Sequence, residues 1–102
     1  MGSKTKIGVS HERIAEFCKK HHIRKLSFYG SVISDHFTHD SDIDVLVEFE
    51  QGQVVGLLRL ASMEIELSEI LGRRVDLRTP ADLSHYFRDD VLSIAEVQYA
   101  KG

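Results

Sequence analysis

Two aspartates one residue apart, Asp42 and Asp44, are the residues of this sequence best placed to act together chemically. They open an apolar segment that alternates as a β-strand does, so both side chains should project from one face. The rise of a strand separates them by about 6.5–7 Å. At an effective dielectric of about 20, two such charges repel by roughly 2–3 kcal/mol. A divalent cation between them would remove this repulsion, as in metal-dependent phosphoryl chemistry, where carboxylates hold Mg²⁺.

A third aspartate, Asp76, lies between two apolar residues of another strand-like segment. An unpaired carboxylate there costs free energy unless its face is open to solvent, paired or in contact with a metal ion. If the strands that carry Asp44 and Asp76 are neighbours, all three carboxylates converge on one patch. The simpler alternative is a salt bridge between Asp76 and one of three nearby arginines, Arg73, Arg74 or Arg78.

A glycine-serine pair, Gly30-Ser31, precedes Asp42 by ten intervening residues. Glycine after a strand allows the backbone to approach a ligand closely. Serine at the start of a helix adds a hydroxyl donor to free N–H groups that attract anions. Such a pair is by itself a common turn. Combined with the three aspartates, it indicates a phosphate-binding turn beside a metal site.

The periodicity of apolar residues predicts the elements that position these side chains. We expect helices over 11–21, 54–71, 79–87 and 89–99, a short helix within 32–37, and strands over 24–29, 43–48 and 73–78. The order α-β-α-β-α-β-α predicts an α+β fold in which helices cover a small mixed sheet of about three strands. The leucine-isoleucine stripe of 54–71 is either core or a partner surface, and we expect core.

Composition sets broad limits on the function. The chain has 102 residues, 42% of them hydrophobic and 28% charged, which is typical of one globular domain over 1–102 with a flexible segment at 1–9. A net charge of -3 makes direct nucleic-acid binding an unfavoured function. The single cysteine, Cys18, excludes an intrachain disulfide and fits a reducing compartment. Because no apolar run has the length of a membrane span, we expect a cytoplasmic protein without membrane attachment.

The glycine-serine pair at 30–31, the aspartates of 42–44 and the aspartate strand of 75–77 together resemble the nucleotidyltransferase superfamily with the DNA-polymerase-beta-like catalytic core. In length and element order the chain is similar to the single-domain branch of that superfamily, the minimal nucleotidyltransferase (MNT) domains. The resemblance covers about 25–99, and 41–47 is its most specific stretch.

This resemblance implies the nucleotidyltransferase fold, ATP as the substrate and two Mg²⁺ ions as cofactors. Gly30 and Ser31 would hold the β- and γ-phosphates. Asp42 and Asp44 would bind both metal ions. Asp76 would bind the metal on the acceptor side and help to deprotonate the attacking hydroxyl group.

The resemblance also implies a partner. MNT proteins are commonly encoded with a HEPN-domain toxin, and they act as antitoxins that bind the toxin and add AMP to one of its tyrosines. The family often continues the glycine-serine pair with a small or basic residue, an alanine and a further glycine, whereas residues 32–36 here supply no basic residue, alanine or second glycine. A catalytically weak antitoxin or scaffold that acts by binding is therefore the alternative. Transfer to a small molecule is less favoured, and a homo-oligomer stays open.

Overall fold

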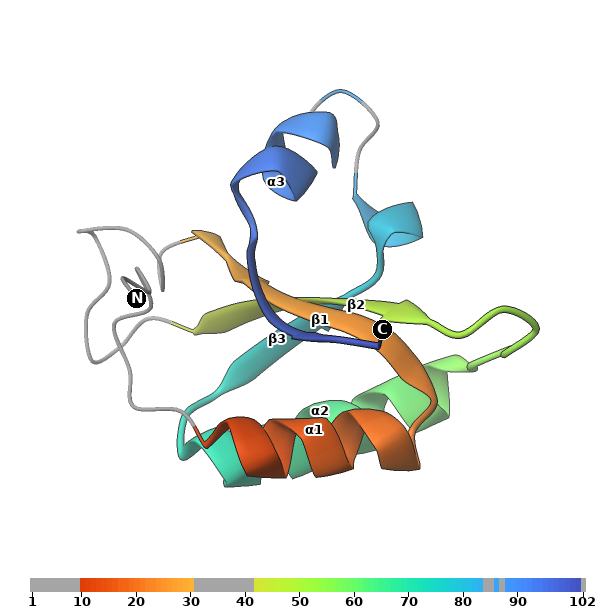
Figure 1. Cartoon of the computed structure of the whole chain (residues 1–102), viewed down its shortest axis with the longest axis vertical. Helices are drawn as coiled ribbons and strands as arrows, with labels where there is room; N and C mark the ends of the chain where they lie inside the picture. Colours follow the sequence, from red (N-terminus) through yellow and green to blue (C-terminus); the bar gives the residue numbers. More distant parts are fainter. Residues whose placement is uncertain (1–9, 31–41, 84–85, 87, 102) are drawn as a thin grey trace.

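The computed structural model of the chain describes residues 10–30, 42–83, 86 and 88–101. The N-terminal segment 1–9 and the short helix expected within 32–37 lie outside these residues. The described elements follow in the order α1 (His11–Lys20), β1 (Ile23–Tyr29), β2 (Ile43–Phe49), α2 (Leu57–Leu71), β3 (Val75–Arg78), the 3₁₀ helix η2 (Pro80–Asp82), α3 (Arg88–Ile94) and β4 (Glu96–Ala100) (Figure 1).

Four strands form one mixed sheet in the order β3-β2-β1-β4. β1 is antiparallel to both β2 and β4, whereas β2 and β3 are parallel. α2 makes the crossover between the two parallel strands, which is the kind of connection that a parallel pair requires. The predicted α+β fold with a small mixed sheet is confirmed, and β4 adds one strand to the three that we expected.

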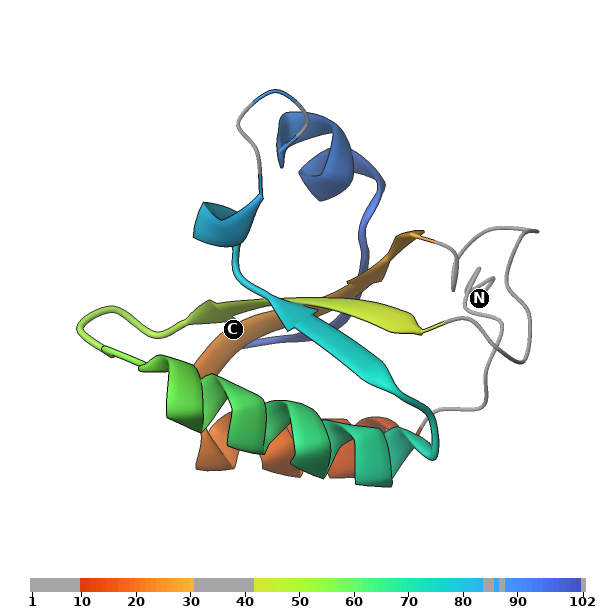
Figure 2. The ribbon, with the colours of Figure 1, turned by 180° about the vertical axis from the view of Figure 1, so that it is seen from behind.

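The helices lie on both sides of this sheet. α1 and α2 cover one face, while η2 and α3 lie on the other side (Figures 1 and 2). The hydrophobic core fills the space between the sheet and the first two helices. Its fully buried members include Ile14, Phe17 and Cys18 of α1, Leu26 and Phe28 of β1, Ile43, Val45 and Val47 of β2, and Met63 and Leu67 of α2.

α1 begins and ends at residues suited to a helix of this length. The Ser10 hydroxyl accepts a hydrogen bond from the N–H of Arg13 at 3.4 Å, which satisfies one free donor of the first turn. Glu12 lies in the first turn, and Lys19 and Lys20 lie in the last. Because these charges oppose the helix dipole at each end, they stabilise the helix that packs beneath β1.

α2 is apolar on two opposite faces. Met63 and Leu67 pack into the core, and Gly72 ends the helix in a left-handed conformation with φ 69°. The other apolar face is exposed and carries Leu57, Leu58 and Ile65. The expectation that the whole stripe of 54–71 is core is therefore wrong for these three residues. Neither α2 nor any other helix in the described part of the chain is long and apolar enough to cross a membrane.

The C-terminal segment corrects the predicted last helix. α3 ends at Ile94 instead of about Tyr99, and Glu96–Ala100 forms β4, which pairs with β1. Val97 and Tyr99 are two residues apart and are β-branched and aromatic, the types that fit a pleated surface. Tyr99 also packs against the core.

The segment after β3 is helical over a shorter range than predicted. η2 holds only Pro80–Asp82, and Leu83 returns to an extended conformation with φ -87° and ψ 142°, so the helix expected to reach about Phe87 is interrupted there. Its predicted start is confirmed. The Asp82 carboxylate accepts hydrogen bonds from both the backbone N–H and the hydroxyl of Thr79, each at 3.1 Å.

Candidate active site

One row of side chains crosses three strands on the face of the sheet that α1 and α2 leave uncovered. Tyr29 of β1 is paired with Asp44 of β2, and Asp44 is paired with Asp76 of β3. Paired residues project to the same side of strands that lie about 4.8 Å apart, so the two carboxylates are direct neighbours. The buried residues that flank Asp44 point the other way, into the core. The condition for the aspartates to converge, that the strands carrying Asp44 and Asp76 are neighbours, is therefore met.

The electrostatics of Asp44 show how closely the acids gather. Partial burial raises the pKa of its carboxyl above the ordinary range, and the charges of Asp76 and Asp42 raise it further, while Arg78 opposes them. Asp42 itself lies exposed, immediately before β2. The charges of Asp42 and Asp76 thus both act on Asp44. A cation would bind favourably there, because it would offset the repulsion between the carboxylates.

Tyr29 is a member of the row that sequence reasoning did not single out. Burial raises the pKa of its hydroxyl to about 12, and the charges of Asp44 and Asp76 contribute in the same direction. The only available signal in the sequence was strand alternation, which places the residue before Gly30 on the face opposite to buried Phe28.

Gly30 lies directly against the carboxylate of Asp44. Its φ of 74° is in the left-handed region, which glycine adopts at least cost. A Cβ atom added to Gly30 would overlap with the Oδ2 atom of Asp44. Glycine is therefore required here for two independent reasons, and the turn after β1 adjoins the acids as expected. Ser31, the second residue of the predicted phosphate-binding pair, lies outside the described residues.

Asp76 also makes the salt bridge that was the simpler alternative for it. The guanidinium of Arg78 donates from Nε to Oδ1 at 3.1 Å and from Nη2 to Oδ2 at 3.4 Å. This hydrogen bonding with Asp76 raises the pKa of Arg78. Both side chains remain well exposed, at 36% for Asp76 and 48% for Arg78. Since exposed ion pairs contribute about 0–1 kcal/mol, this contact can open at little cost.

Side chains of α2 position β3 at the edge of the sheet. The N–H of Leu77 donates to Oε2 of Glu64 at 2.8 Å, and the N–H of Val75 donates to Oγ of Ser68 at 3.1 Å. Backbone donors at an edge strand otherwise lack partners in the sheet. These two bonds lie on either side of Asp76 along the chain, so they fix the place of its backbone beside β2.

The acids fit a magnesium site that a nucleotide would complete. In the described part of the chain, no three Asp, Glu, His or Cys side chains stand ready to hold a metal ion. The adjacent pair Asp44 and Asp76 nevertheless offers an oxygen-only donor set. Mg²⁺ usually takes one or two protein carboxylates, keeps several waters and binds substrate phosphates as well. The donor chemistry therefore suits this ion, with phosphate oxygens supplying the remaining ligands.

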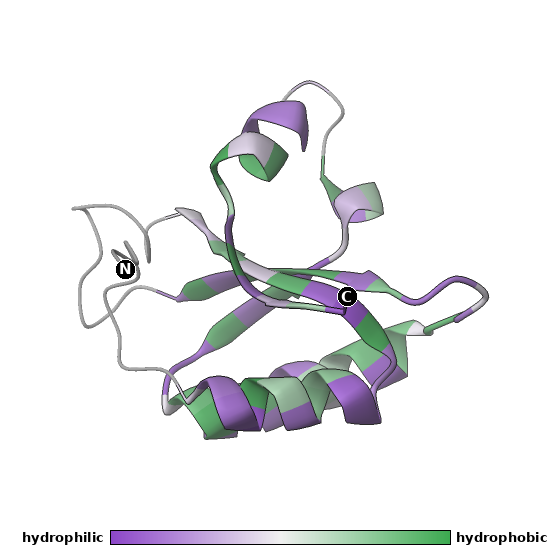
Figure 3. Ribbon diagram, viewed as in Figure 1, coloured by the Kyte–Doolittle hydropathy of each residue, from purple (hydrophilic) through white to green (hydrophobic). Residues whose placement is uncertain are grey.

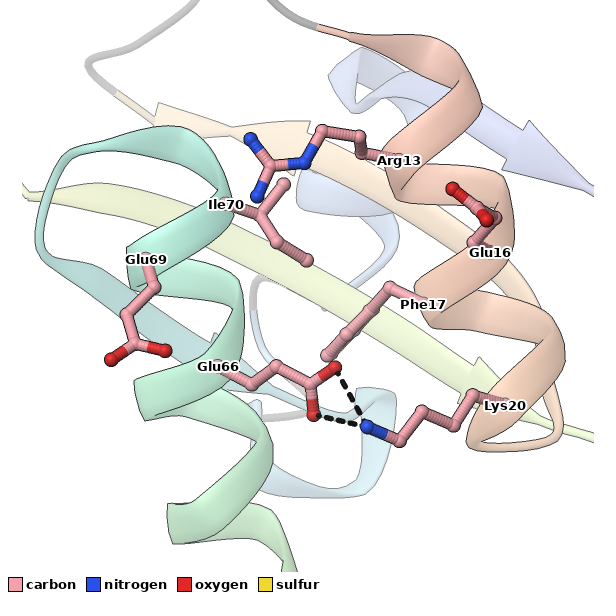
Figure 4. Close-up of a pocket in the computed structure, with 7 residues that line it drawn as sticks. All are labelled: Arg13, Glu16, Phe17, Lys20, Glu66, Glu69 and Ile70. Atoms are coloured by element: carbon pink, nitrogen blue, oxygen red, sulfur yellow. Dashed lines mark hydrogen bonds and ion pairs between the residues drawn. The ribbon is translucent and has the colours of Figure 1, made fainter.

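A pocket of about 320 Å³ lies elsewhere, between α1 and α2 (Figure 4). Its walls carry charges of both signs, from Arg13, Glu16, Phe17, Lys20, Glu66, Glu69 and Ile70. Glu66 bridges the two helices, because its carboxylate contacts Lys20 at 3.2 Å and His21 at 2.9 Å. None of the row of acids lines this pocket, so we assign these contacts to the packing of the helices.

The comparison with known proteins identifies the family. The sequence matches the family model of the nucleotidyltransferase domain over residues 11–97. The chain belongs to this family. It is 35% identical over 83 residues to the candidate protein adenylyltransferase MJ0435 of Methanocaldococcus jannaschii, covering 81% of this chain and 87% of that protein. It is 34% identical over 70 residues to the protein adenylyltransferase MntA of Thermococcus cleftensis, covering 69% of each chain.

The fold of this nucleotidyltransferase domain also has solved counterparts. One is in the complex of a tri-AMPylated HEPN toxin of Shewanella oneidensis with its MNT antitoxin. The match has a TM-score of 0.66 at 16% identity and covers 89% of this chain and 70% of that chain. At this identity the likeness concerns the fold, and it agrees with the minimal nucleotidyltransferase fold that the sequence motifs indicate.

Proposed function

We propose that this nucleotidyltransferase moves AMP from ATP to a hydroxyl group of a partner protein, a tyrosine of a HEPN-family toxin, and acts as the antitoxin of that pair. The observation that carries the proposal is the register of Asp44 with Asp76, with the backbone of Gly30 against the Asp44 carboxylate. The relatives named as protein adenylyltransferases and the AMPylated toxin bound to an MNT antitoxin support the choice of donor and acceptor. An ATP donor and the free thiol of Cys18 are both compatible with the expected cytoplasmic location.

Nucleotide binding is assigned to the turn after β1. Gly30 and Ser31 would hold the β- and γ-phosphates of ATP, with backbone N–H groups and the serine hydroxyl as donors. The close approach of Gly30 to Asp44 supports this assignment, because it brings the turn and the acids to one place.

Metal binding is assigned to the three aspartates. Asp42 and Asp44 would hold both Mg²⁺ ions, and Asp76 would join them on the acceptor side. When bound, the ions offset the negative charge of the carboxylates and the triphosphate and align the reacting groups.

Proton removal from the acceptor is assigned to Asp76. As the hydroxyl oxygen forms its bond to the α-phosphorus, the bond from that phosphorus to the bridging oxygen breaks and pyrophosphate leaves. The hydroxyl proton passes to the Asp76 carboxylate. Arg78 must first release this carboxylate, and the exposure of both side chains leaves room for the guanidinium to turn away.

The ion pair also favours a second candidate function, an antitoxin or scaffold that acts mainly by binding its partner. While Arg78 contacts Asp76 at 3.1 Å, the one carboxylate assigned both as the base and as the acceptor-side metal ligand is occupied. A chain that kept this contact would transfer AMP slowly and could still neutralise a partner through its surface.

Incubation of the full chain with α-labelled ATP, Mg²⁺ and a HEPN partner distinguishes the two candidates. We expect the intact mass of the partner to rise by added AMP, and Asp44→Asn or Asp76→Asn to abolish the transfer. Glu48→Gln is the matched control, since Glu48 lies further along β2 and pairs with Lys25 and Arg24 instead of the acids.

Transfer by both aspartate variants at the parental rate contradicts the site assignment. Absence of any transfer, together with tight binding of the partner by an Asp42→Asn/Asp44→Asn chain, favours the antitoxin that acts by binding.

A further inference from the structure

The second apolar face of α2 forms one continuous stripe on the outside of the molecule. Three of its side chains are largely exposed, Leu57 at 85%, Leu58 at 89% and Ile65 at 63%, and Val54 just before the helix is 91% exposed. Within α2, Leu57, Leu58, exposed Ala61 and Ile65 follow the spacing i, i+1, i+4 and i+8, which keeps them on one side of the helix. We call these five residues the outer stripe.

The outer stripe sets α2 apart from α1. The exposed side of α2 carries apolar residues such as Leu57, Leu58 and Ile65, whereas purple, hydrophilic segments recur along α1 (Figure 3). The solvent side of α1 carries charges such as Glu12, Glu16 and Lys19. A helix that is apolar on both sides is normally buried on both. α2 is buried on only one, through Met63 and Leu67.

The size of the outer stripe suits an interface. Its side chains expose on the order of 500 Å² of apolar surface, near the upper end of the largest patches on ordinary monomers. A stable dimer needs about 800 Å² from each partner. The polar residues beside the stripe, such as Ser62 and Glu69, can supply the rest as a rim.

The charges of α2 favour an antiparallel copy of the same helix as the occupant. Gly56 at its start makes no side-chain capping bond, and the first turn holds no acidic residue. Its second half carries Glu66 and exposed Glu69. An antiparallel neighbour centred on Ala61 would place each Glu69 one turn beyond Leu57, the first residue of the other helix, on the side where the uncapped N–H groups and the dipole attract negative charge. The same arrangement packs Leu57 and Leu58 against Ile65 around the small Ala61.

We propose that the outer stripe is the interface of a symmetric dimer, in which α2 packs antiparallel against α2 of a second copy of this chain. α2 lies on the side of the sheet away from α3 (Figures 1 and 2), and the row of Tyr29, Asp44 and Asp76 faces the α3 side. Both candidate active sites of the dimer therefore face outward. This inference stands independently of the proposed function.

Sedimentation of the full chain over a concentration series tests the interface. We expect a reversible dimer, and Leu58→Glu should weaken it by at least about tenfold. Ile94→Glu is the matched control, because Ile94 is 62% exposed but lies on α3. Both positions are exposed, so circular dichroism should show an unchanged fold. A chain that stays monomeric throughout, or a dimer that Leu58→Glu leaves intact, overturns the proposal.

Disulfide trapping tests the orientation. Ala61→Cys should cross-link to its own copy under mild oxidation, and exposed Ser93→Cys on α3 should not. A mixture of Leu57→Cys and Ile65→Cys chains should form the mixed disulfide, since both residues lie within α2 and four positions from Ala61. In a parallel pair, Leu57→Cys would instead cross-link to itself, an outcome that contradicts the antiparallel arrangement. Native Cys18 is buried and should not interfere.

A binding measurement with a HEPN partner tests the other possible occupant of the outer stripe, which is a partner protein instead of a second copy of this chain. If the chain is monomeric alone and Leu58→Glu abolishes binding of that partner, the outer stripe is a partner surface and the dimer is refuted. Because AMP transfer is read separately by mass, loss of the dimer and loss of the enzymatic activity are distinguishable results.

Discussion

The backbone of Gly30 lies so close to the Asp44 carboxylate that a Cβ atom on Gly30 would overlap with Oδ2. The turn after β1 and the acid on β2 therefore form one unit. A substitution at either residue therefore affects the position of the other, although the two residues are fourteen positions apart in the chain.

Gly30→Ala should impair both stability and AMP transfer. The left-handed φ costs an alanine about 1–2 kcal/mol, and the overlap with Asp44 adds to this cost. Gly52→Ala is the matched control, since Gly52 has φ 87° but nothing within 4 Å of the added Cβ. Thermal unfolding should show Gly30→Ala as the less stable variant, and its transfer rate should fall at least about tenfold. Equal effects of the two variants would mean that the contact with Asp44 does not matter.

Asp44→Asn should stabilise the fold while it abolishes transfer. The half-buried carboxylate lies directly opposite Asp76 on the neighbouring strand. Removal of one of two opposed like charges should raise the free energy of unfolding by about 0.2–1 kcal/mol. The variant should therefore melt higher than the parent when no divalent ion is added. A lower melting temperature would show that Asp44 forms favourable contacts which outweigh the repulsion.

Arg78→Gln should strengthen magnesium binding and leave the fold nearly as stable. The ion pair with Asp76 is exposed, so its loss costs about 0–1 kcal/mol. The freed carboxylate then becomes available to a cation. We expect a larger rise of melting temperature with added Mg²⁺ than in the parent. Arg24→Gln, which removes the 2.7 Å pair with Glu48, should respond to Mg²⁺ as the parent does. Identical magnesium responses of all three proteins would argue against Asp76 as a ligand.

Cys18 should resist thiol reagents until the chain unfolds. Burial raises the pKa of its thiol from 9.0 to about 12. The folded state thus holds this proton more tightly than the unfolded state. The contribution of Cys18 to stability is fully present below pH 9 and declines as the pH rises toward 12. A Cys18→Ala chain should lose less stability than the parent between pH 9 and 11. Rapid labelling of the native parent at pH 9 would contradict this account.

The main features of the candidate site followed from local patterns. Alternation along 43–48 placed Asp42 and Asp44 on one face, and the same reasoning placed Asp76 on a strand. Their meeting required β2 and β3 to be neighbours, a condition that the sequence pattern left open and that the parallel pairing with α2 as its crossover fulfils. The mixed character of the sheet followed similarly from the connection between β1 and β2, which has no room for a long crossover helix.

The remaining features depend on contacts between distant parts of the chain. β4 pairs with β1 where Tyr99 meets the core, and the short alternation of Val97 and Tyr99 does not by itself reveal that pairing. The exposure of Leu57 and Leu58 could not be foreseen either, because a helix with two apolar faces has a periodicity that does not show which face is covered. The contact between Arg78 and Asp76 was one of several salt bridges that the sequence allowed.

The bonds from Glu64 and Ser68 to the outward N–H groups of β3 have a consequence for how other proteins can meet this chain. An edge strand with free donors invites a foreign strand to join the sheet. Here the donors of Val75 and Leu77 are already taken by α2. A foreign strand could join this margin only by displacing these two bonds, so α2 protects the sheet against β-augmentation beside Asp76. Recognition of a partner protein would then use side chains and not an added strand at this edge.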